Sequence, residues 1–399
     1  MMFRNLFQRD FRKFNLNPIF SLIIGFCIFY GYFDTYFDDG SSMVALIEKA
    51  LSQPQTFDHI FWSTSPYFYY LMKGVIAFFL VYTSCFAYFL YRSTISSFDN
   101  EGKAKFQAIM LSHSLTNLLD LAMAAALVYA VGAISYLING SFTTLDDLYG
   151  KLDASIMDWL KSVPTLVELP YPLSFLFAIL LVDFVTYAKH WVCHYSRFLW
   201  YTVHRVHHSA EVLHSLGIGP AFAFDIIFFR VPAIFLTLAL TKLFHAEPLF
   251  LETLAFHACG LLVGKFSHAS AFYKFAYHNV VVRRISDFYG AGVYHYTHHS
   301  AIEGEEAVNL AGTLYMFWDR LFGTYVKPRE EKPPVGLTHQ PDIVLNPFVL
   351  YFSGIHKIIY ELKSNPPKYW LKIIFGSVHF TPPMTRDVLI LGYTKKLAR

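Results

Sequence analysis

Charged residues are scarce in this chain of 399 residues, where they make up 15% of the total. An ordinary soluble domain has roughly 25%, and the apolar fraction here reaches 55%. These proportions argue against a purely soluble globule and against intrinsic disorder. The formal net charge is only +3, and the chain has neither a long basic run nor a nucleic-acid module, so we expect no nucleic-acid partner.

Cysteine is also rare, and the four cysteines lie far apart, which argues against a disulfide framework and a cysteine-bound cluster. The chain has no H-E-x-x-H helix of a zinc protease, no C-x-x-C-H haem attachment site and no glycine-rich nucleotide loop. A redox reaction on this chain would therefore depend on electrons from a partner protein.

Long apolar runs are abundant. Residues 14–33, 74–91 and 121–138 contain no charged residue, and residues 169–188 contain only Asp183 and no other charge. A helix of such length can cross a hydrocarbon core of about 30 Å. A further apolar stretch, 216–266, is interrupted by prolines and reads as a helical hairpin. We therefore predict an all-α, polytopic membrane helical bundle.

Lysine and arginine orient the predicted spans, because cytoplasmic loops near span ends carry an excess of them. Residues 1–17 contain four and residues 92–105 contain three, whereas 34–66 contain one and 139–170 contain two. We expect a multi-pass protein with both termini and the histidine-rich region on the cytoplasmic side. A bacterial inner membrane and the endoplasmic reticulum fit this pattern equally.

Three histidine clusters stand out among 18 histidines. Box one is His190-Trp-Val-Cys-His194, box two is His204-Arg-Val-His207-His208, and box three is His295-Tyr-Thr-His298-His299. Residues three and four apart are neighbours on a helix surface, so each box is expected to direct two or three imidazoles at one point. Imidazole is a good ligand for iron, zinc, copper and nickel.

The number of histidines favours a metal site over core packing. Each buried neutral imidazole needs a partner for both its donor and its acceptor nitrogen, which an apolar core does not provide. The eight imidazoles of the boxes exceed what one tetrahedral zinc ion needs and suit two metal ions. Iron is the leading candidate.

The same residues resemble the fatty acid hydroxylase/sterol desaturase superfamily. The pattern Asp183-x-x-x-Tyr187-x-x-His190-x-x-x-His194 is similar to the family's first box with its lead-in. Box two with Trp200 and Ser209, the segment Phe266-Ser-His268-Ala, and box three with Ser300 resemble the later motifs. The run Phe317-Trp-Asp319-Arg-Leu-Phe-Gly-Thr-Tyr325 resembles the closing motif.

The resemblance covers about 169–327 and implies a histidine-bound, non-haem di-iron centre with O2 as co-substrate. It adds His268 as a ninth candidate ligand, which as a lone histidine would otherwise be read as a non-ligand. The implied activity is hydroxylation or desaturation of a lipid C–H bond, in a fatty acyl chain, an ether lipid or a sterol. The electron donor would be a cytochrome b5-like protein, a ferredoxin or a reductase.

We accordingly expect three regions: N-terminal transmembrane helices over 1–168, a catalytic domain over 169–327, and a cytoplasmic or interfacial tail over 328–399. The chain departs from the family at three places, with Trp191 after the first histidine, Ser270 after His268-Ala, and residues 216–220 after box two. These departures leave the substrate class open more than the metal site.

Two polar residues before box one are candidates for supporting roles in catalysis. Asp183 shares a helix face with His190 and is expected to orient a metal-bound imidazole; the alternative is a carboxylate in water at the helix end. Tyr187 either forms a hydrogen bond in the site or belongs to an interfacial aromatic belt. In the closing motif, Asp319 and Arg320 are expected to form an ion pair.

Two other classes of function also account for many histidines. A membrane metal transporter or metal-binding protein would need ligands along a path through the bilayer, whereas the boxes lie at span ends on one side. A zinc-dependent membrane hydrolase would use fewer histidines and a carboxylate base. Both remain alternatives to the lipid oxidoreductase.

Overall fold

The computed structural model describes residues 99–140, 158–213, 231–246, 267–268, 272–305, 307–311, 315–337 and 346–385, together with positions 155, 249, 252–253 and 256. Over these residues the chain is helical and contains no strand beyond two isolated bridges, which confirms the all-α class. The predicted spans 14–33 and 74–91 and much of the hairpin 216–266 lie outside the described residues.

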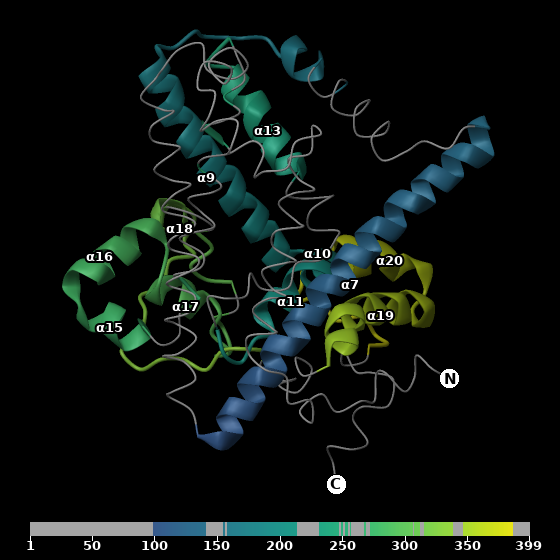
Figure 1. The fold of residues 1–399 in the computed structure, drawn as a ribbon, viewed down its shortest axis with the longest axis vertical. Helices are drawn as coiled ribbons and strands as arrows, with labels where there is room; N and C mark the ends of the chain where they lie inside the picture. Colours follow the sequence, from purple (N-terminus) through teal and green to yellow (C-terminus); the bar gives the residue numbers. More distant parts are fainter. Residues whose placement is uncertain are drawn as a thin grey trace, which may run out of the picture.

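The first described helix, α7 (Asn100–Asn139), contains the predicted span 121–138 (Figure 1). Asp99 caps its start by accepting a hydrogen bond from the backbone of Gly102 at 2.7 Å. Ala108 and Ile109, near this start, pack against Val206 of box two. The distal part exposes large apolar side chains, among them Leu137 and Ile138.

Helix α9 (Tyr171–Tyr195) carries box one on its last turns. Its 25 residues correspond to about 37 Å of helix, and Pro172 lies in its first turn, where a missing N–H costs nothing. The predicted span 169–188 is confirmed as helical from Tyr171 onward, and the helix continues beyond it to Tyr195. Among the described residues it is the one helix long and apolar enough to cross a membrane, so a multi-pass topology remains a prediction.

A second apolar helix, α13 (Val231–Lys242), packs along α9. Its end is tied to the chain before α9, because the Leu243 carbonyl accepts hydrogen bonds from the backbone of Leu166 at 3.0 Å and Val167 at 3.2 Å. Phe244 stacks on Phe177 of α9 at 5.3 Å. The pair forms one elongated unit that leads down to the histidines (Figure 1).

Short helices surround the end of α9. After α10 (Arg197–Leu199), box two lies on the π-helix η3 (Trp200–His204) and α11 (Arg205–His208). Box three lies on α17 (Val293–His298) and its C-cap His299. Beside them are α15 (Tyr273–His278), α16 (Val280–Tyr289) and α18 (Phe317–Phe322). Gly290, with φ +61, ends α16 where a Cβ would lie 2.6 Å from Ala311 Cβ, so the close approach requires glycine.

The C-terminal segment folds back onto the region of box two. It comprises α19 (Pro347–Ser364), η7 (Pro367–Tyr369) and α20 (Trp370–Phe375). Val349 and Leu350 of α19 pack against α7 and box two. Gly354 lets α19 approach so closely that a Cβ there would lie 1.6 Å from the Tyr201 carbonyl oxygen. Residues 346–385 are thus part of the same packed unit, while the interfacial position of the tail remains a prediction.

Candidate metal centre

The structure brings the nine predicted histidines together in two adjoining groups. The first group contains His190, His194, His204, His208 and His298, and the second contains His207, His268, His295 and His299. Within each group the candidate ligand nitrogens lie within 4.8 Å of one another. Each group therefore could hold a metal ion.

Boxes two and three each divide between the two groups, which corrects the expectation that each box points at one place. His204 and His208 face the first group and His207 the second, whereas His295 and His299 face the second and His298 the first. Successive residues on an α-helix are about 100° apart, so adjacent histidines such as His207 and His208 diverge. An H-x-x-H-H box consequently contributes to two neighbouring sites.

The spacing of the nitrogens fits ligands of a common ion. The Nε2 atom of His204 lies 3.0 Å from His190 Nε2 and 3.1 Å from His208 Nε2. In the second group, His295 Nε2 lies 3.2 Å from the Nε2 atoms of His268 and His299. Two nitrogens each about 2.1 Å from one metal ion, at a right angle, are about 3.0 Å apart.

Backbone carbonyls fix which nitrogen faces the centre. His190 Nδ1 donates to the Leu310 carbonyl at 2.8 Å, and His298 Nδ1 donates to the Val308 carbonyl at 2.9 Å. Because a carbonyl only accepts, each Nδ1 carries the proton and each Nε2 carries a lone pair. The buried Nε2 of His298 has no hydrogen-bond partner, as expected of an atom that awaits a cation.

Burial keeps these imidazoles in the form that binds metal. Desolvation first, and the neighbouring histidines next, lower the pKa of His204, His208, His295, His298 and His299 well below 6.5. The rings are therefore neutral at pH 7, and only a neutral imidazole has a free lone pair. The two groups contain no carboxylate.

Asp319 organises the loop that supplies the two carbonyls. Its buried carboxylate accepts hydrogen bonds from the backbone of Leu310 at 2.6 Å and Ala311 at 2.8 Å, and from Thr324 Oγ1 at 2.6 Å. The expected Asp319–Arg320 pair is wrong, because Arg320 turns outward and binds Asp287 at 2.6 Å. Asp319 instead acts on His190 through the backbone of Leu310.

The two polar residues before box one contact the closing motif. Asp183 is buried, and its Oδ2 accepts a hydrogen bond from Trp318 Nε1 at 2.9 Å. Tyr187 forms a hydrogen bond with Thr324 Oγ1 at 3.0 Å, and its ring stacks on Phe322 at 5.5 Å. Both side chains thus join α9 to α18, and a role in catalysis remains a prediction for each.

A π-helical turn shapes box two. The backbone N–H of Arg205 bonds to the Trp200 carbonyl, five residues earlier, and such turns recur at functional sites. The Trp200 ring lies 5.1 Å from His194 and 5.3 Å from His208, and so forms an aromatic wall of the first group. Neither feature can be read from histidine spacing.

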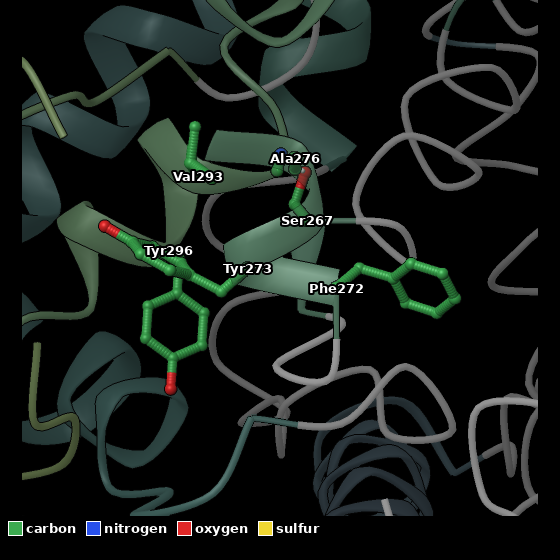
Figure 2. A pocket seen from close by; sticks show the side chains of 7 residues that line it. Ser267, Phe272, Tyr273, Ala276, Val293 and Tyr296 are labelled. Carbon is green, nitrogen blue, oxygen red and sulfur yellow. Dashed lines mark hydrogen bonds between the residues drawn. The ribbon is translucent and has the colours of Figure 1, made fainter. Parts of the chain in front are cut away.

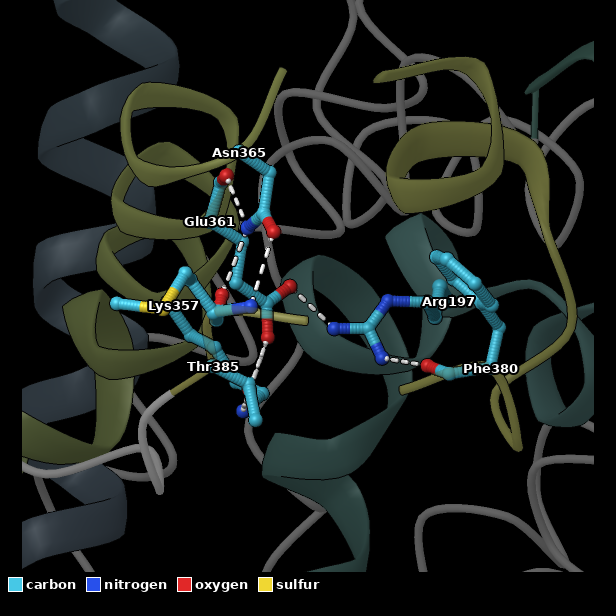
Figure 3. Close-up of polar contacts among 7 residues, drawn as sticks. Arg197, Lys357, Glu361, Asn365, Phe380 and Thr385 are labelled. Atoms are coloured by element: carbon cyan, nitrogen blue, oxygen red, sulfur yellow. Dashed lines mark hydrogen bonds and ion pairs between the residues drawn. The ribbon is translucent and has the colours of Figure 1, made fainter. Parts of the chain in front are cut away.

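A buried polar network, the Arg197–Glu361 network, holds the link between boxes one and two (Figure 3). Arg197 pairs with Glu361 and donates to the Phe380 carbonyl at 2.6 Å. Glu361 also accepts from Thr385 Oγ1 at 2.5 Å and pairs with Lys357 at 3.2 Å. Ser196 and Ser377 add an antiparallel bridge. The network ties α19 and residues 377–385 to the chain directly after His194.

A small cavity lies between α15, α17 and Ser267 (Figure 2). It has a volume of about 10 Å³, room for about one water molecule. Ser267, Tyr273, Val293 and Tyr296 are among its lining residues. This cavity cannot take a lipid chain, and the phenylalanines predicted to line a tunnel, Phe222, Phe224, Phe228 and Phe229, lie outside the described residues.

Comparison with known families agrees with this geometry. The fatty acid hydroxylase family model matches residues 175–324, from α9 to the end of the closing motif. The matched segment, less than half of the chain, is similar to this family. The match confirms the resemblance to the fatty acid hydroxylase/sterol desaturase superfamily and implies an oxidoreductase. No curated protein and no solved structure matches the chain.

The matched segment 175–324 contains all nine histidines, but it excludes some of the residues that pack against the histidine boxes. The family match ends at residue 324, whereas Glu361, Phe380 and Thr385 of the Arg197–Glu361 network lie beyond it. Helix α7, which packs on box two, precedes it. The histidine boxes are therefore packed against flanking segments that the family match does not include.

Proposed function

We propose that the chain is an O2-dependent membrane oxidoreductase that hydroxylates or desaturates a C–H bond of a lipid at two histidine-bound iron ions. The observation that carries this proposal is the division of nine imidazoles into adjoining groups of five and four. The stacked rings of His208 and His299, 4.3 Å apart, belong to different groups and show how closely the two meet. Nitrogen-rich paired sites suit redox-active iron.

The chain's own residues hold and orient the centre. Bound iron would pass electrons from an external donor to O2 and so provide the oxidising power needed to break an unactivated C–H bond. The His190 and His298 rings are held by the carbonyls of Leu310 and Val308, and Asp319 holds the loop that contains Leu310. Trp200 covers two imidazoles of the first group and limits the access of water from that side.

A lipid is the proposed substrate because the centre lies at the end of an apolar helix. His190 and His194 occupy the last turns of α9, which is apolar enough to cross a bilayer. A molecule dissolved in the bilayer can reach this point by lateral diffusion, whereas a polar metabolite has no comparable route. An acyl chain, an ether lipid and a sterol-like ring all meet this requirement.

The proposed reaction needs an external electron donor, and the histidine boxes must lie on the side of the membrane that the donor can reach. A cytochrome b5-like protein, a ferredoxin or a reductase would approach the histidine side from the cytoplasm. We therefore propose a multi-pass protein with both termini and all three boxes cytoplasmic. Cysteine labelling at positions near 145 and 300 tests this topology, because the two sites should label from opposite sides of the membrane.

Lipid analysis tests the activity itself. Cells that express the intact chain under oxygen should contain a lipid species shifted by one added oxygen atom or by the loss of two hydrogens. A variant with His207→Ala and His208→Ala should lack that species, because each group loses one ligand. An unchanged lipid profile together with an altered water-soluble metabolite would contradict the substrate assignment.

The alternative functions fit the described residues less well. A transporter needs ligands spread along a path through the bilayer, whereas these nine histidines gather in two adjoining groups. A zinc hydrolase uses a carboxylate base beside its metal, whereas both groups consist of histidine alone. The lipid oxidoreductase is the function that uses all nine rings.

A further inference from the structure

Helix α16 carries apolar side chains on its outer face. Val281, Ile285 and Phe288 are 66%, 53% and 55% exposed, and their spacing of four and three residues places them on one stripe of the helix. The opposite side faces the protein, where Ser286 is buried and Val282 packs against the core around Tyr294. A water-exposed helix would have the reverse distribution of apolar and polar residues.

Neighbouring helices extend this stripe into a larger surface. Phe275 of α15 is 55% exposed, and Phe317 and Leu321 of α18 are 54% and 58% exposed. Helices α15, α16 and α18 lie together on one side of α9 (Figure 1). We call the surface formed by these six residues the apolar face: Phe275, Val281, Ile285, Phe288, Phe317 and Leu321. Exposed apolar side chains gathered on one side of a protein in this way usually mark an interaction site.

The apolar face is continuous with the membrane helix. Trp318 of α18 packs against Phe184 of α9 at 4.9 Å, and Phe322 stacks on Tyr187 at 5.5 Å. At 1.5 Å per residue, Phe184 and Tyr187 lie about 20 and 24 Å along α9 from Tyr171. A hydrocarbon core of about 30 Å that begins near Tyr171 therefore still surrounds α9 where α18 packs.

Basic residues lie beside the apolar face. Lys274 and Arg284 are exposed on α15 and α16, and Arg284 is adjacent in sequence to Ile285. The acidic group on the same helix, Asp287, is already paired with Arg320 at 2.6 Å. An amphipathic helix with cations beside an apolar stripe is the form that binds an interface containing anionic lipid.

We propose that the apolar face is embedded in the lipid leaflet on the histidine side of the membrane, with Lys274 and Arg284 at anionic headgroups. This inference rests on the proposed function only in requiring α9 to cross the bilayer. It assigns a lipid surface, rather than a protein, as the occupant of the face. Helix α16 would then lie in the plane of the interface and hold the adjoining box three at the depth of the lipid chains.

Spin labels on the full-length chain in vesicles test the depth of the face. Single cysteines are introduced as Ile285→Cys and Phe288→Cys, with Glu303→Cys as the exposed control, in a chain whose four native cysteines are replaced by alanine. The vesicles contain phosphatidylcholine with or without phosphatidylglycerol. Collisions with O2, which concentrates in lipid, and with a water-soluble nickel chelate are measured.

We expect labels at 285 and 288 to collide more with O2 than with the nickel chelate, and the label at 303 to show the reverse. The double variant Lys274→Glu/Arg284→Glu should reduce the depth of both labels most in vesicles with phosphatidylglycerol. Equal nickel accessibility at 285 and 303 would overturn the proposal. Low accessibility to both reagents at 285 would also overturn it, because protein would then cover the face.

The same experiment separates this inference from the proposed function. Label depth does not depend on metal or turnover, so a chain with His298→Ala should give the same depths. Product formation in the same vesicles reports the enzymatic activity independently. A deep label without a lipid product leaves the apolar face in lipid and contradicts the activity, whereas a product with water-exposed labels contradicts the inference alone.

Discussion

Two buried polar clusters lie on either side of the link between boxes one and two, and they differ in how their polar groups are satisfied. In the Arg197–Glu361 network, opposite charges and complementary groups meet, since a glutamate lies among an arginine, a lysine and a threonine. In the histidine groups, by contrast, groups of the same kind face one another, since the Nε2 atoms of neighbouring histidines lie 3.0–3.2 Å apart.

This difference separates a structural cluster from a ligand site. The Arg197–Glu361 network pairs its opposite charges with one another inside the protein. In the first group the Nε2 atoms of His190 and His298 carry lone pairs, because their Nδ1 atoms donate to backbone carbonyls, and the buried Nε2 of His298 has no partner within the protein. A metal ion would satisfy these lone pairs, so changes in the two clusters should have different consequences.

The largest effect is expected from removing a ligand. Replacing His207, His208, His298 or His299 singly by alanine should abolish activity and reduce bound metal, because one of the two groups loses a ligand. Metal content and lipid product are measured together. His278→Ala is the matched control and should be neutral, since this exposed histidine belongs to neither group and lies 3.8 Å from Glu330. A His298→Ala variant with full activity and metal would contradict the ligand assignment.

Breaking the Arg197–Glu361 network should instead reduce stability. Glu361→Ala leaves Arg197 and Lys357 buried without their carboxylate, which costs about 3–5 kcal/mol. Thermal unfolding in detergent should show a clearly lower melting temperature, with unchanged metal stoichiometry in the folded fraction. The exposed Glu303→Ala is the control. Loss of metal without loss of stability would show that the network belongs to the site.

Asp319→Asn should have an effect of intermediate size, on metal affinity. The variant weakens the hold on the backbone of Leu310 and Ala311, and disturbing such supporting contacts typically lowers metal affinity about 10–100-fold. Competition with a chelator measures the affinity. Asp287→Asn, which removes a partly exposed ion pair, should leave it unchanged. Equal affinities in both variants would contradict the positioning of His190 by Asp319.

The mildest perturbation is a change of pH, which should alter the stability of the metal-free protein. Burial lowers the pKa of five histidines below 6.5 in the fold, so below about pH 6.5 the unfolded chain binds protons that the fold excludes. Stability should fall as the pH drops, by up to about 1.4 kcal/mol per pH unit for each such histidine. Melting temperatures of the metal-free chain between pH 7.5 and 5.5 test this, and a flat profile would contradict it.

The sequence predicts which histidines form the centre better than it predicts how they divide between the two groups. Helical spacing places the pairs His190/His194, His204/His208 and His295/His299 together, and each pair does share a group. The division of His207 from His208 was missed, because the spacings of three and four were treated as one face. The same 100° rotation per residue explains why Asp319 turns inward while Arg320 turns outward to Asp287.

Contacts between residues far apart in the chain could not be predicted from local sequence patterns. Arg197 and Glu361 are 164 residues apart, and neither stands out from ordinary surface charges until the fold joins them. The carbonyls of Leu310 and Val308 belong to an irregular loop, whose conformation is set by Asp319 rather than by its own sequence. Hydropathy identified α9, but it does not show how far the helix continues past the apolar run to carry box one.

Metal analysis tests the central claim most directly. Full-length protein is purified in mild detergent, and iron and zinc per chain are measured by elemental analysis for the wild type, His298→Ala and His295→Ala. The account predicts about two iron ions per wild-type chain, negligible zinc, and a loss of iron in each variant, because each removes a ligand from a different group. One metal ion per chain, or zinc in place of iron, would contradict it.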